Sequence, residues 1–134
     1  MGGALLGRVV GGGRRRGRLQ AAFLLDEGAC DTARRLGAEA RELGRELGLT
    51  ALEMTGLATE GLAMVEQGEV RPGMRCLDEA SAAALGGEYE EDFPVCWTCC
   101  YVIYACERVR DYERAAQWCR KVVEYASRHR CRVP

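Results

Sequence analysis

Apolar and small residues recur with helical spacing in three stretches of the chain, and each stretch follows a short turn-like segment. The three segments are 28–30, 68–70 and 110–112, which lie 40 and 42 residues apart. After each segment, apolar or small residues fall at i, i+3, i+7 and i+10, the spacing of one helical face. These inner positions are Ala33, Leu36, Ala40 and Leu43; Gly73, Cys76 or Leu77, Ala80 and Ala83; and Ala115, Trp118, Val122 and Tyr125. A repeat of this period predicts stacked helical hairpins.

A second helix is expected before each turn-like segment. In the middle repeat it spans 50–67, and Thr50 with Glu53 has the S/T-x-x-E spacing of a capping box, which marks a helix start. In the third repeat it spans 94–108 and begins with a proline, which suits the first turn of a helix. In the first repeat only the short piece 19–27 is left, because terminal repeats are often atypical.

These patterns predict an all-α fold in which about three helical hairpins stack into an α-solenoid. The expected pairs span about 18–47, 50–86 and 92–130, within a repeat domain at 18–134. Residues 1–17 are rich in glycine and arginine, and we expect a disordered basic lead-in there because they offer no apolar face to bury. A plain helical bundle is the alternative, and the common register of the three copies favours the solenoid.

Charge and composition narrow the class of function. The formal net charge is −1, and the arginine run at 14–16 has no interleaved aromatic residues, so direct nucleic-acid binding by this chain alone is not expected. No run approaches the roughly 20 apolar residues that span a bilayer, and the N-terminus lacks the ordered regions of a signal peptide. We therefore expect a cytoplasmic protein without a membrane partner. Its eight cysteines are expected to be reduced and to serve as small apolar residues.

The sharpest chemical signal is the CxxC motif of Cys96 and Cys99, near the start of the helix expected at 94–108. A helix N-terminus stabilises a thiolate, so both residues are candidate redox thiols. A redox CxxC normally lies between a strand and a helix, however, and no strand is predicted. Zinc would need four ligands with paired spacing, whereas the only histidine, His129, lies far along the chain. Packing is the favoured role, a thiol redox or zinc-binding protein is the alternative, and no catalytic residue, metal ligand or cofactor is assigned.

Aromatic residues concentrate in the third repeat. Tyr101 and Tyr104 lie on one side of the helix expected at 94–108, and Ala58 and Leu62 are inner residues of the matching helix at 50–67. Residues with this spacing usually form a core, but the first helices of the pairs in a solenoid can also line a concave binding surface. These four residues are therefore the candidate partner-binding groove, with a core role as the alternative.

Two parts of the chain resemble a known family. Residues 68–80 read GEVRPGMRCLDEA and are similar to the GEVAEGMRLLDEA stretch of tetratricopeptide-like regions in bacterial regulators. Residues 100–107 and 111–118 read CYVIYACE and DYERAAQW, and they are similar to the YC..I.AC…D..RA.EW pattern of the same proteins. Those proteins are mainly LuxR-type transcriptional regulators of actinobacteria. The resemblance covers roughly 29–130.

The resemblance implies a tetratricopeptide-like α-solenoid that acts as a non-enzymatic protein–protein interaction scaffold. The chain would bind a protein or peptide, either alone or as a truncated repeat region of a transcriptional regulator. Cys100 and Cys106 match cysteines of the family pattern, which implies packing roles for them, whereas Cys96 and Cys99 have no counterpart. The regulators often carry a nucleotide-binding module and a helix-turn-helix, and neither is recognisable here, so ATP hydrolysis and DNA binding are not implied. The oligomeric state is left open.

Overall fold

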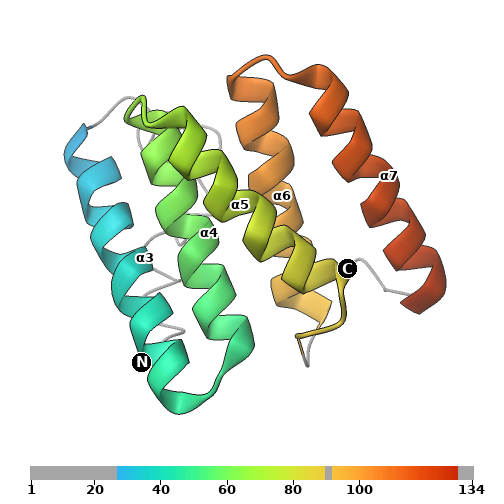
Figure 1. Cartoon of the computed structure of the whole chain (residues 1–134), viewed down its shortest axis with the longest axis horizontal. Helices are drawn as coiled ribbons and strands as arrows, with labels where there is room; N and C mark the ends of the chain where they lie inside the picture. The colour runs from blue at the N-terminus through green and yellow to red at the C-terminus, as the bar shows by residue number, and fades with distance from the viewer. Residues whose placement is uncertain (1–26, 90–91, 130–134) are drawn as a thin grey trace, which may run out of the picture.

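The residues that the computed structural model describes, 27–89 and 92–129, fold into helices only (Figure 1). The helices are α3 (Glu27–Leu47), α4 (Thr50–Glu66), α5 (Val70–Leu85), α6 (Asp92–Arg108) and α7 (Tyr112–His129). No strand occurs among these residues, so the expected all-α class is confirmed. The basic segment 1–17 and nearly all of the helix expected at 19–27 lie outside the described residues. Within the described part, no helix is both long and apolar enough to cross a membrane.

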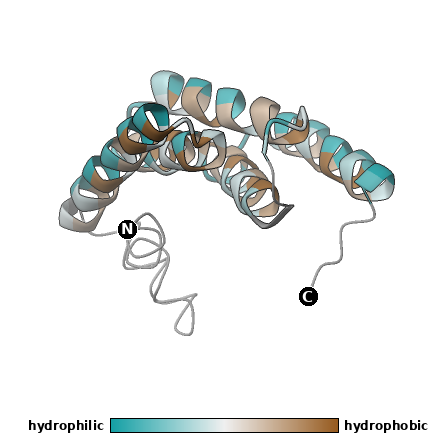
Figure 2. Cartoon of the chain, turned by 90° about the horizontal axis from the view of Figure 1, so that it is seen from below, coloured by the Kyte–Doolittle hydropathy of each residue, from teal (hydrophilic) through white to brown (hydrophobic). Residues whose placement is uncertain are grey.

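The described helices stack so that each packs against the next one in the chain. α4 also packs against α6, and α5 crosses in front of both in Figure 1. α3 and α7 lie at the two ends of the stack, and Figure 2 shows the helices forming a shallow arch. α4 is the most enclosed helix, since every residue from Thr55 to Val65 except Glu60 is buried. It carries apolar or small residues around most of its circumference, as a helix covered on several sides must.

The core lies between α4, α5, α6 and α7. Its main cluster contains Leu57, Ala58, Leu62, Val65, Met74, Leu77, Ala80, Tyr101, Val102, Ala105, Cys106, Ala115 and Trp118. A second cluster joins the C-terminal end of α5 to α6 and α7, and it contains Ala84, Tyr89, Val95, Cys99 and Tyr125. In α5 and α7 the inner positions expected from the repeat pattern are buried or half-buried. Burial of this apolar surface is the main force that holds the stack together.

Small residues bring the first three described helices into backbone contact. A Cβ atom built on Gly73 of α5 would lie 2.6 Å from the carbonyl oxygen of Gly61 in α4. A Cβ atom on Gly56 of α4 would lie 2.6 Å from the carbonyl oxygen of Gly37 in α3. Real Cβ atoms do not approach so closely, so a larger residue would push these helices apart.

Four helices end in the same tight turn. In each, a residue in the left-handed region follows the helix, and the next N–H donates to a carbonyl five residues earlier, which is the Schellman pattern. After α4 the left-handed residue is Gly68, with φ of 90°. After α6 it is Arg110, with φ of 61°, and the Asp111 N–H donates to the Cys106 carbonyl at 2.9 Å. The expected turn at 28–30 is wrong, because these residues already belong to the first turns of α3.

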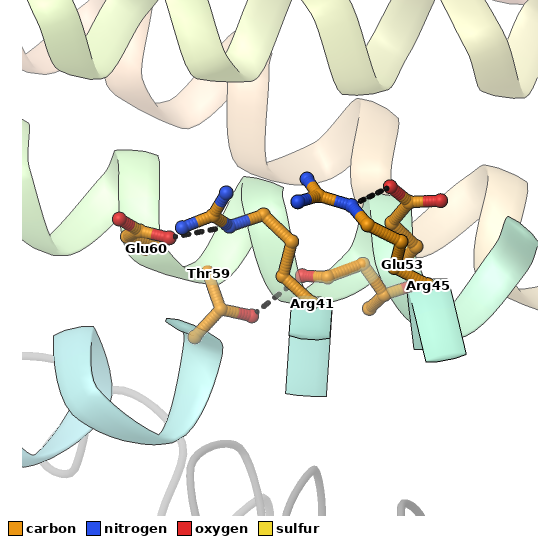
Figure 3. A network of polar contacts seen from close by, with 6 residues as sticks. Arg41, Arg45, Glu53, Thr59 and Glu60 are labelled. Atoms are coloured by element: carbon orange, nitrogen blue, oxygen red, sulfur yellow. Dashed lines mark hydrogen bonds and ion pairs between the residues drawn. The ribbon is translucent and has the colours of Figure 1, made fainter. Parts of the chain in front are cut away.

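The expected capping box at the start of α4 is also wrong. Thr50 is the first helical residue, and the N-cap is Leu49, which makes no side-chain cap hydrogen bond. The turn after α3 is only two residues long, so the helix begins before Thr50 can act as a cap. Glu53 instead accepts a hydrogen bond from Arg45 of α3, at 3.2 Å (Figure 3). The neighbouring pair, Arg41 and Glu60, joins the same two helices at 3.0 Å.

Candidate functional site

The best candidate site is the boundary between the two adjacent helices α4 and α6, which we call the α4–α6 seam. It is formed by Ala58, Leu62 and Glu66 on α4 and by Tyr101, Tyr104 and Arg108 on α6. The structure therefore brings together all four residues of the candidate groove. They belong to, or pack against, the main core cluster.

Three of these groove residues lie in the core. Ala58, Leu62 and Tyr101 are 0%, 6% and 9% exposed. Burial raises the pKa of Tyr101, and hydrogen bonding to Trp97 and Thr59 opposes this shift. The ring of Tyr101 also packs against Trp97, with centroids 5.8 Å apart and planes tilted by 53°. These three residues form the buried part of the seam, so direct contact between them and a partner stays a prediction.

Tyr104 is the groove residue that reaches the surface. It is half-buried and packs against the core cluster. Burial raises its pKa, the nearby carboxylate of Glu66 adds to this shift, and the guanidinium of Arg108 opposes it. Tyr104 thus sits where the aromatic side of the seam meets its charged end.

Glu66 and Arg108 form that charged end. Arg108 donates from Nε to Oε1 of Glu66 at 3.1 Å and from Nη2 to Oε2 at 3.3 Å. The Glu66 side chain is only 2% exposed, while that of Arg108 is 50% exposed. This hydrogen bonding raises the pKa of Arg108. A charge-assisted, two-point contact of this kind fixes the relative position of both helix ends.

Sequence reasoning missed this ion pair, although a signal for it was present. Glu66 and Arg108 are each the last residue of their helix, and they lie 42 residues apart, the spacing between the second and third repeats. Residues at equivalent positions of stacked repeats lie next to each other. An acid and a base separated by one full period therefore predict a bond between neighbouring repeats.

A second polar group fixes α7 to α5 on the other side of the core. Asp78 of α5 forms an ion pair with Arg114 and accepts a hydrogen bond from Nε1 of Trp118 at 3.3 Å. The backbone N–H of Arg114 donates to the Asp111 side chain at 3.1 Å, which caps the start of α7. Lys121 lies over the Trp118 ring, 4.9 Å from its centroid. The rotation of α7 about its own axis is therefore fixed by several directional contacts.

The two cysteines of the CxxC motif lie in different environments. Cys96 is exposed, whereas Cys99 is 2% exposed and belongs to the second core cluster. Burial, followed by the nearby Cys100 and Cys96, raises the pKa of Cys99 to about 12. The thiolate expected at this helix N-terminus is thus disfavoured at Cys99, because desolvation outweighs the helix dipole. Redox activity of Cys96 stays a prediction.

The other cysteines in the described part of the chain also divide between core and surface. Cys30 and Cys106 are buried, Cys76 is half-buried, and Cys100 and Cys119 are exposed. The packing role implied for Cys106 agrees with its burial, whereas Cys100 is exposed. Among the described residues, no three His, Cys, Asp or Glu side chains are grouped so that they could hold a metal ion. His129 stacks on Tyr125 instead, with ring centroids 4.1 Å apart.

Comparison with known proteins adds no family assignment to this geometry. No family model, curated protein or solved structure gives a significant match to the chain.

Proposed function

We propose that this chain is a non-enzymatic protein–protein interaction scaffold with a tetratricopeptide-like arrangement of helices. One observation carries the proposal: α4 and α6 lie side by side, and each is packed against the helix that follows it. The same packing unit thus occurs twice, and Glu66 and Arg108 join the equivalent ends of its two copies. Stacked units of this kind present one row of helices to a partner.

The α4–α6 seam is the surface we propose for partner binding. Tyrosine and arginine are the residue types that most often carry the binding energy of protein interfaces. Tyr104 is half-buried, so it loses little conformational freedom on binding, and half of the Arg108 side chain remains open to a ligand. The partner would be a peptide that offers an apolar side chain to Tyr104 and a carboxylate to Arg108.

Selection of peptides from a displayed random library tests this proposal. We expect the selected peptides to carry an acidic residue near an apolar one. Tyr104→Ala or Arg108→Ala should weaken their binding about tenfold or more, the range of an interface hot spot. Leu47→Ala is the control, because Leu47 is a large exposed apolar residue of α3 and lies outside the seam. Peptides that bind the Tyr104 and Arg108 variants as tightly as the original chain would contradict the proposed site.

The resemblance to LuxR-type regulators supports a role as the repeat region of a cytoplasmic transcriptional regulator. The gene itself tests this part of the proposal. An in-frame segment that encodes a helix-turn-helix downstream of Pro134 would support it. A downstream frame that encodes an unrelated domain would contradict it, without affecting the proposed role of the seam.

A further inference from the structure

α7 carries a second apolar stripe beside the one that faces the core. Tyr112, Ala116, Cys119 and Val123 recur at intervals of four, three and four residues, so they line one face of the helix. Tyr112 and Val123 are each 64% exposed, and Ala116 and Cys119 are exposed as well. Large exposed apolar residues that line up in this way mark an interaction surface more often than isolated ones do.

The preceding repeat shows what such a stripe does when it is covered. The residues 42 positions earlier, on α5, include Met74, Leu77 and Ser81, which are 5%, 0% and 0% exposed. α6 packs against α5, and Met74 and Leu77 share a core cluster with residues of α6. α7 lies at the end of the described stack, and no described helix takes the place on α7 that α6 takes on α5. The stripe therefore matches the face of α5 that binds α6, but no described helix covers it.

Charges beside the stripe restrict what can occupy it. Glu113 and Arg120 both lie on the same edge of the stripe, next to Tyr112 and Cys119. They are seven residues apart, so they occupy equivalent positions two helical turns from each other. Neither forms an ion pair with another described residue. One edge of the face thus presents an acid near its N-terminal end and a base near its middle.

We propose that the stripe on α7 binds α7 of a second copy of this chain, with the two helices antiparallel. In this arrangement Tyr112 packs opposite the second copy's Val123, and Ala116 packs opposite the second copy's Cys119. The largest residues then meet at the two ends of the contact and the smallest ones in its centre. The twofold axis repeats both layers, so every position of the stripe finds a partner.

The charged edge favours this occupant and this direction. Antiparallel helices bring the same edge of both copies together, so Glu113 faces the second copy's Arg120 and the axis creates the pair twice. Parallel helices would instead place each charged edge against the opposite edge, where Ala115 and Val122 lie. Only the antiparallel pair of identical copies therefore brings Glu113 and Arg120 together as opposite charges across the contact. The contact uses no residue of the α4–α6 seam and does not depend on the proposed function.

The mass of the protein in solution tests the proposal. Sedimentation equilibrium of the full chain, in a reducing buffer that prevents disulfide cross-links, should show a reversible monomer–dimer equilibrium. Val123→Asp should abolish the dimer, because it places a charge in the buried layer. Glu113→Arg and Arg120→Glu should each weaken dimerisation about tenfold, since each puts like charges opposite each other. Glu42→Arg makes the same charge change at an exposed position of α3, at the other end of the stack, and should leave the dimer unchanged.

Mixing the two charge variants gives the decisive result. Each alone pairs like charges, but an equimolar mixture of Glu113→Arg with Arg120→Glu pairs opposite charges at both sites. We expect the mixture to recover dimers close to the level of the original chain, with one copy of each variant. Circular dichroism should show that all variants keep the helical content of the original chain. A monomeric mass at concentrations up to about 1 mM would overturn the proposal, and so would a mixture that stays as weak as the two single variants.

Discussion

Glu66 and Arg108, the last residues of α4 and α6, lock the ends of these helices together through two hydrogen bonds of 3.1 and 3.3 Å. The carboxylate is almost fully covered while the guanidinium remains half open. The pair therefore joins the ends of two helices and also places a cation at the edge of the α4–α6 seam. The two side chains differ in their exposure, because only the Glu66 carboxylate is held away from water.

Removing the cation should cost stability because it leaves a covered carboxylate unpaired. We expect Arg108→Ala to lower the free energy of unfolding by about 1–2 kcal/mol, less than for a fully buried pair because water still reaches Arg108. Urea denaturation measures this change. The loss should shrink in a Glu66→Gln background, where no charge is left behind. An equal loss in both backgrounds would show that the pair contributes nothing of its own.

Alkaline pH should destabilise the fold through its buried acids. Burial raises the pKa of Cys99 and Tyr89 to about 12 and that of Cys106 to about 11. The folded chain therefore keeps protons that the unfolded chain has already lost, and stability falls as pH rises from about 9 towards 12. Denaturation at a series of pH values measures the slope. Cys99→Ala should make the slope shallower because it removes one of these buried acids, and an unchanged slope would contradict this expectation.

The turn after α6 offers a stabilising substitution. Arg110 holds a left-handed conformation that costs a residue with a Cβ atom about 1–2 kcal/mol, a cost that glycine escapes. Glycine also makes the unfolded chain more flexible, which offsets part of this gain. We therefore expect Arg110→Gly to raise the free energy of unfolding by only about 0.5–1 kcal/mol. Gly68→Ala is the converse test, since Gly68 has φ of 90° and open space around it. Arg110→Gly would be expected to lower the melting temperature only if the arginine side chain itself stabilised the turn.

The contact between α4 and α5 should not tolerate a single methyl group. Gly73→Ala would bring a Cβ atom to 2.6 Å from the Gly61 carbonyl oxygen, so the helices must separate. We expect a net loss of about 1–3 kcal/mol despite the better helix propensity of alanine. Ala82→Gly reverses the substitution at an exposed position of α5 and isolates the propensity effect, about 1 kcal/mol. Similar stability of Gly73→Ala and the original chain would show that the helices adjust without strain.

The repeat pattern of the sequence predicted the helical class and the positions of the helices from Thr50 onwards. It could do so because a helix that buries one face carries apolar residues at a regular spacing. It did not predict the start of α3 or the residue that caps α4. Thr50 and Glu53 have the letters of a capping box, but the length of the preceding turn decides which residue can cap, and that length is a property of the packed structure. The difference between Cys96 and Cys99 follows from burial and was equally invisible in the motif.

The candidate site shows the same division. Spacing placed Ala58, Leu62, Tyr101 and Tyr104 at one helix boundary, and the structure brings them together there. Whether an inner residue supports a surface or forms it depends on its neighbours, and periodicity alone does not contain that information. Only Tyr104 reaches the surface. The exposed stripe on α7 was overlooked for a related reason, since a stripe looks the same in sequence whether or not another helix covers it.

The uneven burial of the thiols gives the molecule a set of built-in reporters of local opening. Cys99 and Cys106 sit in different core clusters and are 2% and 0% exposed, while Cys96 lies on the surface a few residues away. A thiol reagent can reach a buried sulfur only when the surrounding helices part. The modification rates of Cys99 and Cys106, compared with that of Cys96, therefore tell whether the two core clusters open separately or together.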